Sequence, residues 1–410
     1  LRQLNKLSQA LEYYKEGESI VQILVPNSNI PLLAEFYQNI AKCYFELKNH
    51  AAALTYYQTA LTYYQQIPQK SKAALYHNLG DIYLEKGQLE QAERYYEQAI
   101  YEAQRVYGNK HTSTAHQYRT LGTFYAQQKN YPKALECYQN AVHCTCDTFS
   151  SVSPQNNPTL NDVLWHHRLL EAIEGKAIVF EQLSQHPNGQ EDNITYLQYA
   201  LNAYLLANEL INHLRQNFKA EGSKLNFAEY SAKIYGQALN VALKLHHRQL
   251  PKALDHAFMF SEKTKAMILL EKIEDSKAKI TAQIPQELLD KEQHLLQQIA
   301  YLHRKLQQKP NDLSFRNAYF ETQKQHEQLL TQFKDNYPHY YQFQHDSQTV
   351  TITQLQQQIN NPQTAIIEYC LTDTHLHIWV ITQQNCYVTS QAKPDLQLLV
   401  KQWQKAVKTM

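Results

Sequence analysis

The chain of 410 residues has little glycine, no dominant charge and no long apolar run. Nine Gly and 13 Pro beside 30 Tyr suit helices with aromatic contacts and argue against a β-sandwich. Thirty-nine Lys and Arg against 38 Asp and Glu leave no basic stripe, so nucleic acid is not an expected partner. No apolar stretch approaches the roughly 18–20 residues that span a bilayer, so a membrane is not expected either.

The sequence has no initiator Met and no signal peptide, and Leu1 falls inside a predicted helix. We therefore expect this chain to be cut from a longer polypeptide. The six Cys residues are scattered and do not suggest the disulfide framework of a short secreted domain. This distribution favours the reducing cytoplasm. Cys144 and Cys146 lack the second ligand pair of a zinc site, so no metal and no cofactor are predicted.

Residues 73–142 contain one pattern of aromatic and small residues twice, with equivalent positions 42 residues apart. Gly80 and Ala92 let two helices approach closely, and bulky residues such as Tyr96 fill the space around the crossing. Gly87 supplies the left-handed conformation that ends the first helix of the pair. The recurring residues are Tyr76, Leu79, Gly80, Tyr83, Ala92, Tyr96 and Ala99, then Tyr118, Leu121, Gly122, Tyr125, Ala134, Tyr138 and Ala141.

This pattern resembles the tetratricopeptide repeat, whose usual period is about 34 residues. The longer period here places extra residues at 107–113, as in the variant of kinesin light chains. The resemblance implies helix pairs that stack in series into a superhelix with a concave groove. The predicted fold class is mainly α: a right-handed helix-turn-helix solenoid, then a helical hairpin and a small α/β segment.

Weaker copies of the pattern extend the predicted superhelix over residues 1–275. Residues 1–24 match the second helix of a repeat, residues 34–142 hold the clear repeats, and residues 162–274 hold degenerate ones. Residues 147–161, rich in Ser, Asn and Pro, are predicted to form a loop before a helix at 162–184. Further turns are expected at 187–189 and 220–223.

Beyond this array, the Leu spacing predicts a helical hairpin at 285–308 and 312–336, within a spacer of residues 276–345. Residues 346–410 are predicted to begin an α/β domain. Its expected strands are 365–371, 376–381 and 386–390, followed by a helix at 394–408. Three short strands and one helix are marginal alone, so this domain should need further elements to cover it.

The order of these parts resembles bacterial proteins in which tetratricopeptide repeats precede a CHAT domain, a caspase-like module. The matching stretches are residues 258–270, the helical hairpin, and residues 364–381, which include Ile367-Glu368-Tyr369. In that family a His/Cys dyad downstream of these strands attacks a peptide carbonyl. This sequence ends before any such motif, so no catalytic residue is predicted. Nearby Cys370, Cys386, His375 and His377 are interpreted as ordinary strand residues.

The first helix of each repeat should line the concave face, with the residue before the Leu-Gly pair pointing inward. The resemblance implies that Asn at this place grips a ligand backbone through its donor and its acceptor. The predicted partner-binding residues are Asn39, Asn78 and Thr120, surrounded by Gln38, Lys42, His77, Asp81, Arg119 and Thr123. Their mixed charge argues against a Lys/Arg clamp for an acidic terminus. Alternatively, these residues face water or another part of the same polypeptide.

Two functions remain open at this stage. The first is a non-enzymatic scaffold that binds a peptide or protein partner in the groove and regulates an attached CHAT module. The second is the regulatory front portion of a caspase-like cysteine peptidase whose dyad lies beyond residue 410. For the segment itself, no enzymatic activity is predicted.

Overall fold

The computed structural model describes residues 2–24, 30–185, 192–215, 221–265, 279, 282–308, 312–337 and 349–393. The predicted fold class is confirmed: the chain is mainly helical, with paired helices in series and a small three-stranded sheet near its C-terminal end. The helices are α1 Arg2–Leu24, α2 Ile30–Glu46, α3 His50–Gln65, α4 Ala73–Glu85, α5 Leu89–Tyr107, α6 Thr112–Gln127, α7 Tyr131–Thr145, α8 His166–Leu183, α9 Asn193–Arg215, α10 Glu221–His246, α11 Ala253–Thr264, α13 Gln286–Gln308, α14 Leu313–Asn336 and α16 Ile352–Gln358. The strands are β1 Ile366–Leu371, β2 His375–Ile381 and β3 Cys386–Ala392.

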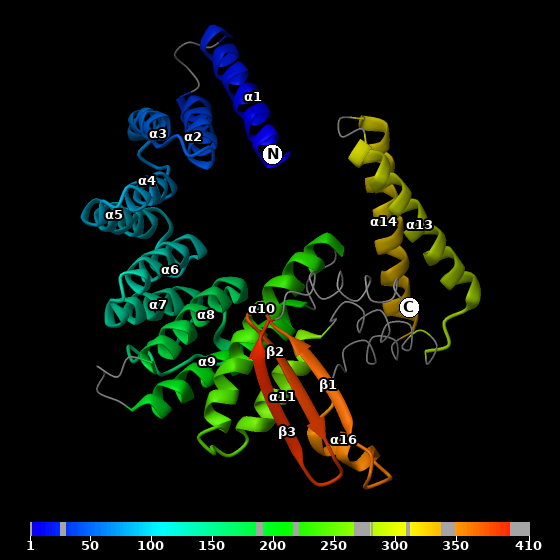
Figure 1. Cartoon of the computed structure of the whole chain (residues 1–410). Helices are drawn as coiled ribbons and strands as arrows, with labels where there is room; N and C mark the ends of the chain where they lie inside the picture. The colour runs from blue at the N-terminus through cyan, green and yellow to red at the C-terminus, as the bar shows by residue number, and fades with distance from the viewer. Residues whose placement is uncertain are drawn as a thin grey trace, which may run out of the picture. The chain divides into compact units, whose positions relative to one another are not determined.

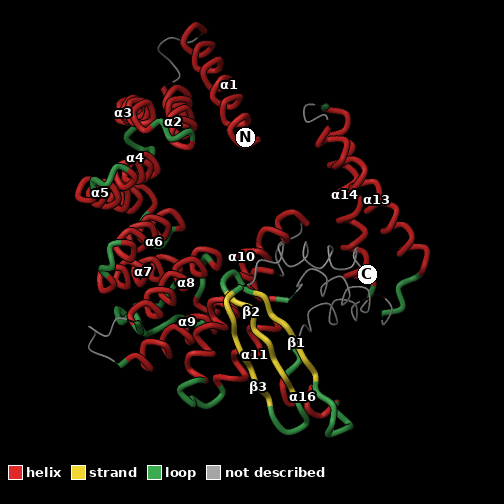
Figure 2. The backbone as a smooth tube through the Cα atoms, viewed as in Figure 1, coloured by secondary structure: helices red, strands yellow, loops and turns green. Residues whose placement is uncertain are grey.

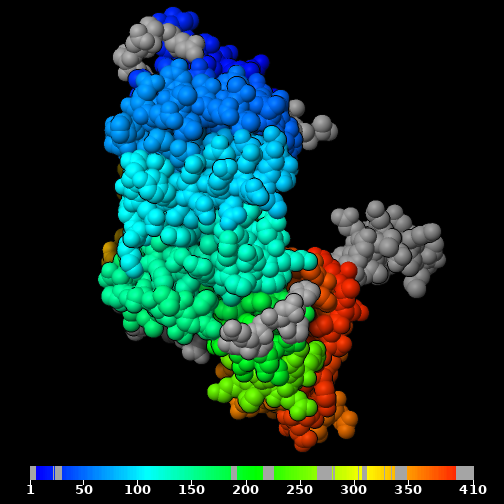
Figure 3. Space-filling model, turned by 90° about the vertical axis from the view of Figure 1, so that its left-hand side faces the viewer, coloured from blue at the N-terminus to red at the C-terminus, as the bar shows by residue number. Residues whose placement is uncertain are grey.

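The chain divides into two units. Unit 1 comprises residues 1–214 and 244–250, and unit 2 comprises residues 215–243 and 251–410. In unit 1 the helices pack as successive pairs, α2 with α3, α4 with α5, and α6 with α7 (Figure 1). Figure 3 shows these pairs as consecutive layers, coloured from blue to teal. The pairs therefore stack in chain order, as the repeat pattern predicts.

The turn inside each pair is built in the same way three times. Lys48, Gly87 and Lys129 occupy equivalent positions with φ values of 61°, 72° and 57°. In the second turn, Gly87 N donates to Leu84 O and Gln88 N donates to Tyr83 O, and the other two turns repeat these bonds. Gly87 confirms the predicted left-handed turn, since glycine adopts this conformation without the strain that a Cβ imposes.

The second helices α3 and α7 start on side-chain caps. Asn49 Oδ1 accepts a hydrogen bond from Ala52 N at 3.1 Å, and Asn130 Oδ1 accepts one from Lys133 N at 3.4 Å. Pro132 sits in the first turn of α7, where its missing N–H costs nothing. These caps fix where α3 and α7 begin.

Three helix crossings bring a glycine against a tyrosine ring. A Cβ on Gly80 would lie 2.6 Å from the Tyr96 ring, and one on Gly122 would lie 3.1 Å from the Tyr138 ring. Tyr138 is also approached from α8, where a Cβ on Gly175 would lie 2.3 Å from its ring. The predicted close packing of small residues around buried tyrosines is confirmed, and α8 continues the array.

Residues 147–161 contain no α-helix, although residues 160 and 161 belong to a 3-10 turn, and the next α-helix begins at His166 and not at Asp162. Asp162 lies in a short 3-10 turn, and its carboxylate closes the loop instead. Asp162 Oδ1 accepts hydrogen bonds from Thr148 N and Thr148 Oγ1, both at 2.8 Å, and Oδ2 accepts one from Phe149 N at 2.7 Å. These donors stabilise the ionised carboxylate and lower the pKa of Asp162.

Lys176 of α8 holds the other side of the same loop. Its fully buried Nζ donates to Gln139 Oε1 at 2.8 Å, Asn156 O at 3.0 Å and Asn157 Oδ1 at 2.9 Å. Burial lowers the pKa of Lys176 to about 7, because the ammonium loses its hydration. Three neutral oxygens thus take the place of water around this cation.

Several other sequence predictions have different outcomes. The predicted turn at 220–223 is wrong for residues 221–223, because α10 begins at Glu221. Gly222 falls in the first turn of that helix, where the backbone N–H groups need no intrahelical partner. The turn predicted at 187–189, residues 266–274 of the degenerate repeats and the helix predicted at 394–408 lie outside the described residues. The domain boundaries at residues 275 and 345 stay predictions.

In unit 2 the strands form an antiparallel sheet in the order β1-β2-β3, as predicted (Figure 2). One face of this sheet packs on α11. Trp379 of β2 is fully buried there, and its ring meets that of Phe258 edge-on at 5.1 Å between centroids. Cys370 of β1 is buried on the same face, with its Sγ 3.0 Å from Thr264 Oγ1. The burial of Cys370 agrees with its interpretation as a packed strand residue.

The predicted helical pair is present as α13 and α14, which pack on each other in unit 2. Leu295, Leu329 and Phe333 form the centre of their shared core. Lys279 Nζ donates to both carboxylate oxygens of Glu292 at 2.8 Å, at the edge of this core.

Candidate functional site

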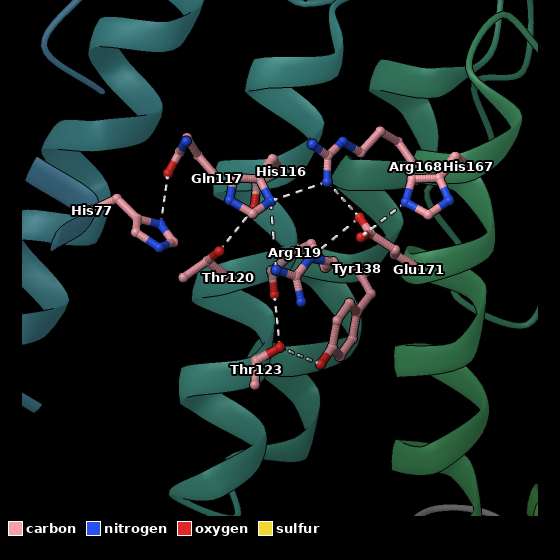
Figure 4. A network of polar contacts seen from close by, with 10 residues as sticks. All are labelled: His77, His116, Gln117, Arg119, Thr120, Thr123, Tyr138, His167, Arg168 and Glu171. Atoms are coloured by element: carbon pink, nitrogen blue, oxygen red, sulfur yellow. Dashed lines mark hydrogen bonds and ion pairs between the residues drawn. The ribbon is translucent and has the colours of Figure 1, made fainter. Parts of the chain in front are cut away.

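The predicted partner-binding residues lie on the first helices α2, α4 and α6 of unit 1. We call this surface the first-helix face; it includes the neighbouring polar residues of α8. Side chains connect the helices along it: the His77 ring of α4 stacks on the His116 ring of α6 at 5.2 Å between centroids. His116 in turn approaches Arg168 of α8 (Figure 4). The face is therefore continuous from α4 to α8.

Asn39 and Asn78 occupy equivalent positions on α2 and α4 and are half-buried. Neither side-chain amide forms a hydrogen bond with any part of the chain that the structure describes. The NH2 group and the carbonyl oxygen of each amide are therefore available to a ligand. Thr120, the third member of this row, differs because its hydroxyl donates to His116 O of its own helix at 3.0 Å. Lys42 is exposed and lies beside Asn39 on α2.

Two other predicted residues, Asp81 and Thr123, contact tyrosine hydroxyl groups of the second helices. Tyr96 OH donates to Asp81 Oδ1 at 2.7 Å, and Tyr138 OH lies 3.0 Å from Thr123 Oγ1. These two contacts are equivalent, since each pair of residues is 42 positions from the other. Burial, with the charge of Asp81, raises the pKa of Tyr96 far above its ordinary value and keeps the phenol a donor. Asp81 and Thr123 are therefore fixed by the fold and less free to rearrange.

Gln38 is held in a similar way, because Tyr64 OH of α3 donates to its Oε1 at 3.1 Å. His77 contacts residues on both sides of the face. Its Nδ1 lies 3.2 Å from Gln117 Oε1 of α6, and its Nε2 lies 3.4 Å from Asp81 Oδ2 on its own helix. His77 thus joins α4 to α6 through polar contacts as well as ring stacking.

At the α6–α8 end of the face, three basic side chains surround the carboxylate of Glu171 (Figure 4). Arg168 Nη1 donates to Glu171 Oε2 at 2.9 Å, and Arg119 Nε lies 3.7 Å from the same oxygen. His167 Nε2 lies 3.6 Å from Glu171 Oε1. The Arg119 Nε–H is buried and has no acceptor at hydrogen-bond distance among the described residues. The negative charge of one carboxylate therefore lies beside the positive charges of two guanidinium groups.

His116 lies between these arginines, with its Nδ1 3.5 Å from a terminal nitrogen of Arg119 and 3.5 Å from one of Arg168. Burial lowers its pKa to about 4, and the charges of Arg119, His77 and Arg168 add to this effect. His116 is consequently neutral near pH 7, and Nδ1 can accept hydrogen bonds from the arginines.

The sequence prediction missed His116, Gln117, His167, Arg168 and Glu171. His116 and Gln117 are equivalent to Ala74 and Leu75 of the preceding repeat, so the repeat pattern gives no polar signal there. Arg168 and Glu171 lie beyond the clear repeats. Their spacing of three on a helix indicates an ion pair but not its position beside α6.

Four thiols outside this face, those of Cys137, Cys144, Cys146 and Cys386, are not activated. Burial raises the pKa of Cys137 and Cys144 to about 12, and that of Cys146 and Cys386 to about 11. Within the ranges that the structure describes, no group of three or more His, Cys, Asp or Glu side chains could hold a metal ion. In the same ranges, no helix is both long and apolar enough to cross a bilayer.

Cys370 and His377 are directly opposite each other on β1 and β2. Both are buried, and His377 Nδ1 lies 2.7 Å from Ser390 Oγ of β3. Burial lowers the pKa of His377 to about 4. The burial of both side chains agrees with their interpretation as ordinary strand residues.

Comparison with known proteins identifies the repeats. The family model for the tetratricopeptide repeat matches residues 32–100 and 71–142. Among solved structures, BtubC (BKLC) from P. vanneervenii is 18% identical, with a TM-score of 0.41, over 54% of this chain and 78% of that one. A putative kinesin light chain from Podosopora anserina is 15% identical, with a TM-score of 0.37, over 49% of this chain and 88% of that one.

The apo form of RapI is 14% identical, with a TM-score of 0.39, over 73% of this chain and 99% of that one. Among curated proteins, none matches this sequence. The match of the family model coincides with α2–α7, the helices whose turns and crossings repeat residue by residue. Residues 32–142 are therefore tetratricopeptide repeats, and the first-helix face is the surface that these repeats present together.

Proposed function

We propose that this chain is a protein-interaction scaffold whose first-helix face binds an extended segment of a peptide or protein partner. Arrays of stacked helical repeats use extended surfaces of this kind for binding. The observation that carries the proposal is the pair of equivalent amides, Asn39 and Asn78, which are accessible and free of partners among the described residues. An amide offers both a donor and an acceptor, which match the C=O and N–H of a peptide backbone.

The rest of the face favours binding because it is already ordered. Asp81 and Thr123 are fixed by Tyr96 and Tyr138, and Gln38 is fixed by Tyr64. Side chains held in place lose little conformational entropy on binding, so more of the interaction energy remains as affinity. Arg119 and Thr120 extend this ordered row toward α8.

A display library of unstructured peptides tests the proposal without a known partner. The chain should enrich a subset of peptides, and Asn39→Ala combined with Asn78→Ala should abolish that enrichment. Each lost pair of hydrogen bonds to a backbone should weaken binding by about 1 kcal/mol or more. Circular dichroism establishes that the variant keeps its helices.

The matched control replaces two exposed amides on the second helices, Gln58→Ala with Gln98→Ala. This control should enrich the same peptides as the unmodified chain. If the asparagine variant captures the selected peptides with unchanged affinity, the first-helix face is not the binding surface.

We further propose that the scaffold regulates a C-terminal CHAT-like module that begins near residue 346, after the superhelix of residues 1–275 and a spacer of residues 276–345. Support comes from the two sequence stretches that carry the resemblance. Lys265 from the first stretch donates to Glu368 Oε2 of the second at 2.5 Å. The alternative function, the front portion of a caspase-like peptidase, predicts no cleavage by this segment itself. Turnover of a fluorogenic peptide pool that disappears on Cys370→Ala or Cys386→Ala would contradict both assignments.

A further inference from the structure

The two arginines at the α6–α8 end of the first-helix face carry more hydrogen-bond donors than the fold uses. We call Arg119, Arg168, His116 and Glu171 the arginine corner. A guanidinium group has N–H donors on all three of its nitrogens. Arg168 contacts the other members through Nη1 alone, and among the described residues its Nε and Nη2 have no acceptor. In the same part of the chain, Arg119 Nε and Nη1 have no acceptor at hydrogen-bond distance either.

The arginine corner is accessible and already ordered. The side chains of Arg119 and Arg168 expose 29% and 32% of their surface. Glu171 Oε2 lies beside both guanidinium groups, and His116 Nδ1 lies 3.5 Å from a terminal nitrogen of each (Figure 4). A ligand would therefore meet two guanidinium groups that the fold has brought together, and little side-chain entropy would be lost on binding.

The charges of the arginine corner do not cancel. Both guanidinium groups are charged at any pH at which the protein is folded. Among the described residues, Glu171 has the only carboxylate within ion-pair distance of either group. His116 is neutral near pH 7 and adds no charge of its own. Two positive charges against one negative charge leave room for one more anionic group.

We propose that the arginine corner binds a carboxylate of the segment that occupies the first-helix face, from an acidic side chain or from the C-terminus of that segment. This inference rests on the proposed function, in which Asn39 and Asn78 bind the backbone of the same segment. The two oxygens of a carboxylate match pairs of guanidinium N–H groups, and the hydrogen bonds are strengthened by charge. The uncharged amides accept many sequences, whereas the arginine corner selects for a negative charge at one place.

Peptides that the full chain selects from the library of unstructured peptides are the probes. They should share an acidic residue or depend on a free C-terminus. Replacing the acidic side chain by its amide, or amidating the C-terminus, removes the charge and keeps the shape. The change that removes the bound carboxylate should weaken binding by about tenfold, and the other change should have little effect. The comparison therefore identifies the source of the carboxylate and requires no change in the protein.

Variants of the arginine corner test the same contact from the protein side. Glu171→Gln keeps an acceptor for Arg168 and removes the competing negative charge, so it should bind the selected peptides several-fold more tightly. Arg119→Gln combined with Arg168→Gln should weaken binding by about tenfold. In this double variant the acidic peptide and its amide should bind equally, because the partner of the carboxylate is gone. The control Arg94→Gln, at an exposed arginine of α5, should change neither affinity.

The possible outcomes separate this inference from the proposed function. Peptides that require Asn39 and Asn78 but bind equally well as uncharged amides would refute the arginine corner and leave the proposed function intact. Weaker binding by Glu171→Gln would also refute it, because the ion pairs would then serve only the fold. A charge preference that persists in the double arginine variant would place the carboxylate elsewhere. A library from which no peptide is enriched would contradict both proposals.

Discussion

Three glycines at helix crossings differ in the distance that would separate an added Cβ from a tyrosine ring. A Cβ would lie 2.3 Å from a tyrosine ring at Gly175, 2.6 Å at Gly80 and 3.1 Å at Gly122. Contacts under 3.0 Å require the ring to move, whereas 3.1 Å requires a displacement of a few tenths of an ångström. The rings of Tyr96 and Tyr138 are buried between helices and have little space into which to move.

Two opposing free energies decide the outcome of Gly→Ala at these sites. Alanine stabilises a helix interior by about 1 kcal/mol relative to glycine. Overpacking of a well-filled core costs about 1–3 kcal/mol. Gly122→Ala should therefore be neutral or stabilising by up to about 1 kcal/mol, whereas Gly80→Ala and Gly175→Ala should lose up to about 2 kcal/mol. Displacing the Tyr96 ring should in addition lengthen its 2.7 Å hydrogen bond to Asp81.

Urea unfolding followed by far-ultraviolet circular dichroism measures these differences as shifts in the midpoint. A constant m-value must accompany the shifts, because repeat arrays can lose cooperativity between neighbouring units. The expected order of stability is Gly122→Ala above Gly80→Ala, with Gly175→Ala lowest. Equal stabilisation at all three positions would refute the reasoning, since helix propensity alone would then account for the result.

Two further predictions concern buried basic groups in unit 1. The folded-state pKa of His116 is about 4, below its ordinary 6.5, so the unfolded chain binds a proton first as the pH falls. The contribution of His116 to stability should be constant above pH 6.5 and should fall by at most about 3 kcal/mol between pH 6.5 and 4, so the loss of stability in this range should be smaller in His116→Gln. Lys176→Met should leave Gln139 Oε1 of α7 and two loop oxygens, Asn156 O and Asn157 Oδ1, without the lysine donor, and should accelerate proteolysis within residues 147–161. Lys110→Met, a change at an exposed lysine, is its control, and equal cleavage of the two variants would contradict the role of Lys176.

The repeats could be predicted because their determinants are local. Gly80, Ala92 and Tyr96 lie close together in the sequence. The helical spacing on α4 and α5, with the short turn between these helices, brings the three residues to one crossing. Gly87 is equally informative, since its position between two apolar patterns indicates a turn. The same kind of evidence supports the sheet, whose three strands are separated by short polar turns. In both cases the contacts that define the element join neighbours in the chain.

The contacts of the first-helix face could not be predicted in the same way. The sequence predicts that Asp81 contacts a partner, yet its carboxylate already accepts a hydrogen bond from Tyr96. The sequence gives no such prediction for Glu171, although this residue forms ion pairs with Arg119 and Arg168. Which polar groups find partners depends on the distance between helices of different repeats, and no spacing within one repeat determines that distance.

The error at Asp162 has a similar cause. An Asp after a loop rich in Ser, Asn and Pro is a good first residue for a helix, because its side chain can cap free N–H groups. Here the carboxylate caps Thr148 and Phe149, at the other end of the loop, and the helix starts at His166. Local propensity allowed both choices, and closure of the loop decided between them.

One contact in unit 2 joins residues that are far apart in the sequence. Lys265 Nζ donates to Glu262 Oε1 at 2.5 Å and to Glu368 Oε2 at 2.5 Å, and so joins the end of α11 to β1. Burial raises the pKa of Glu262, and the hydrogen bond and charge of Lys265 oppose this effect. Glu262 and Lys265 belong to the first stretch that carries the resemblance, and Glu368 belongs to the second. The two stretches are therefore two halves of one contact that attaches the sheet to α11.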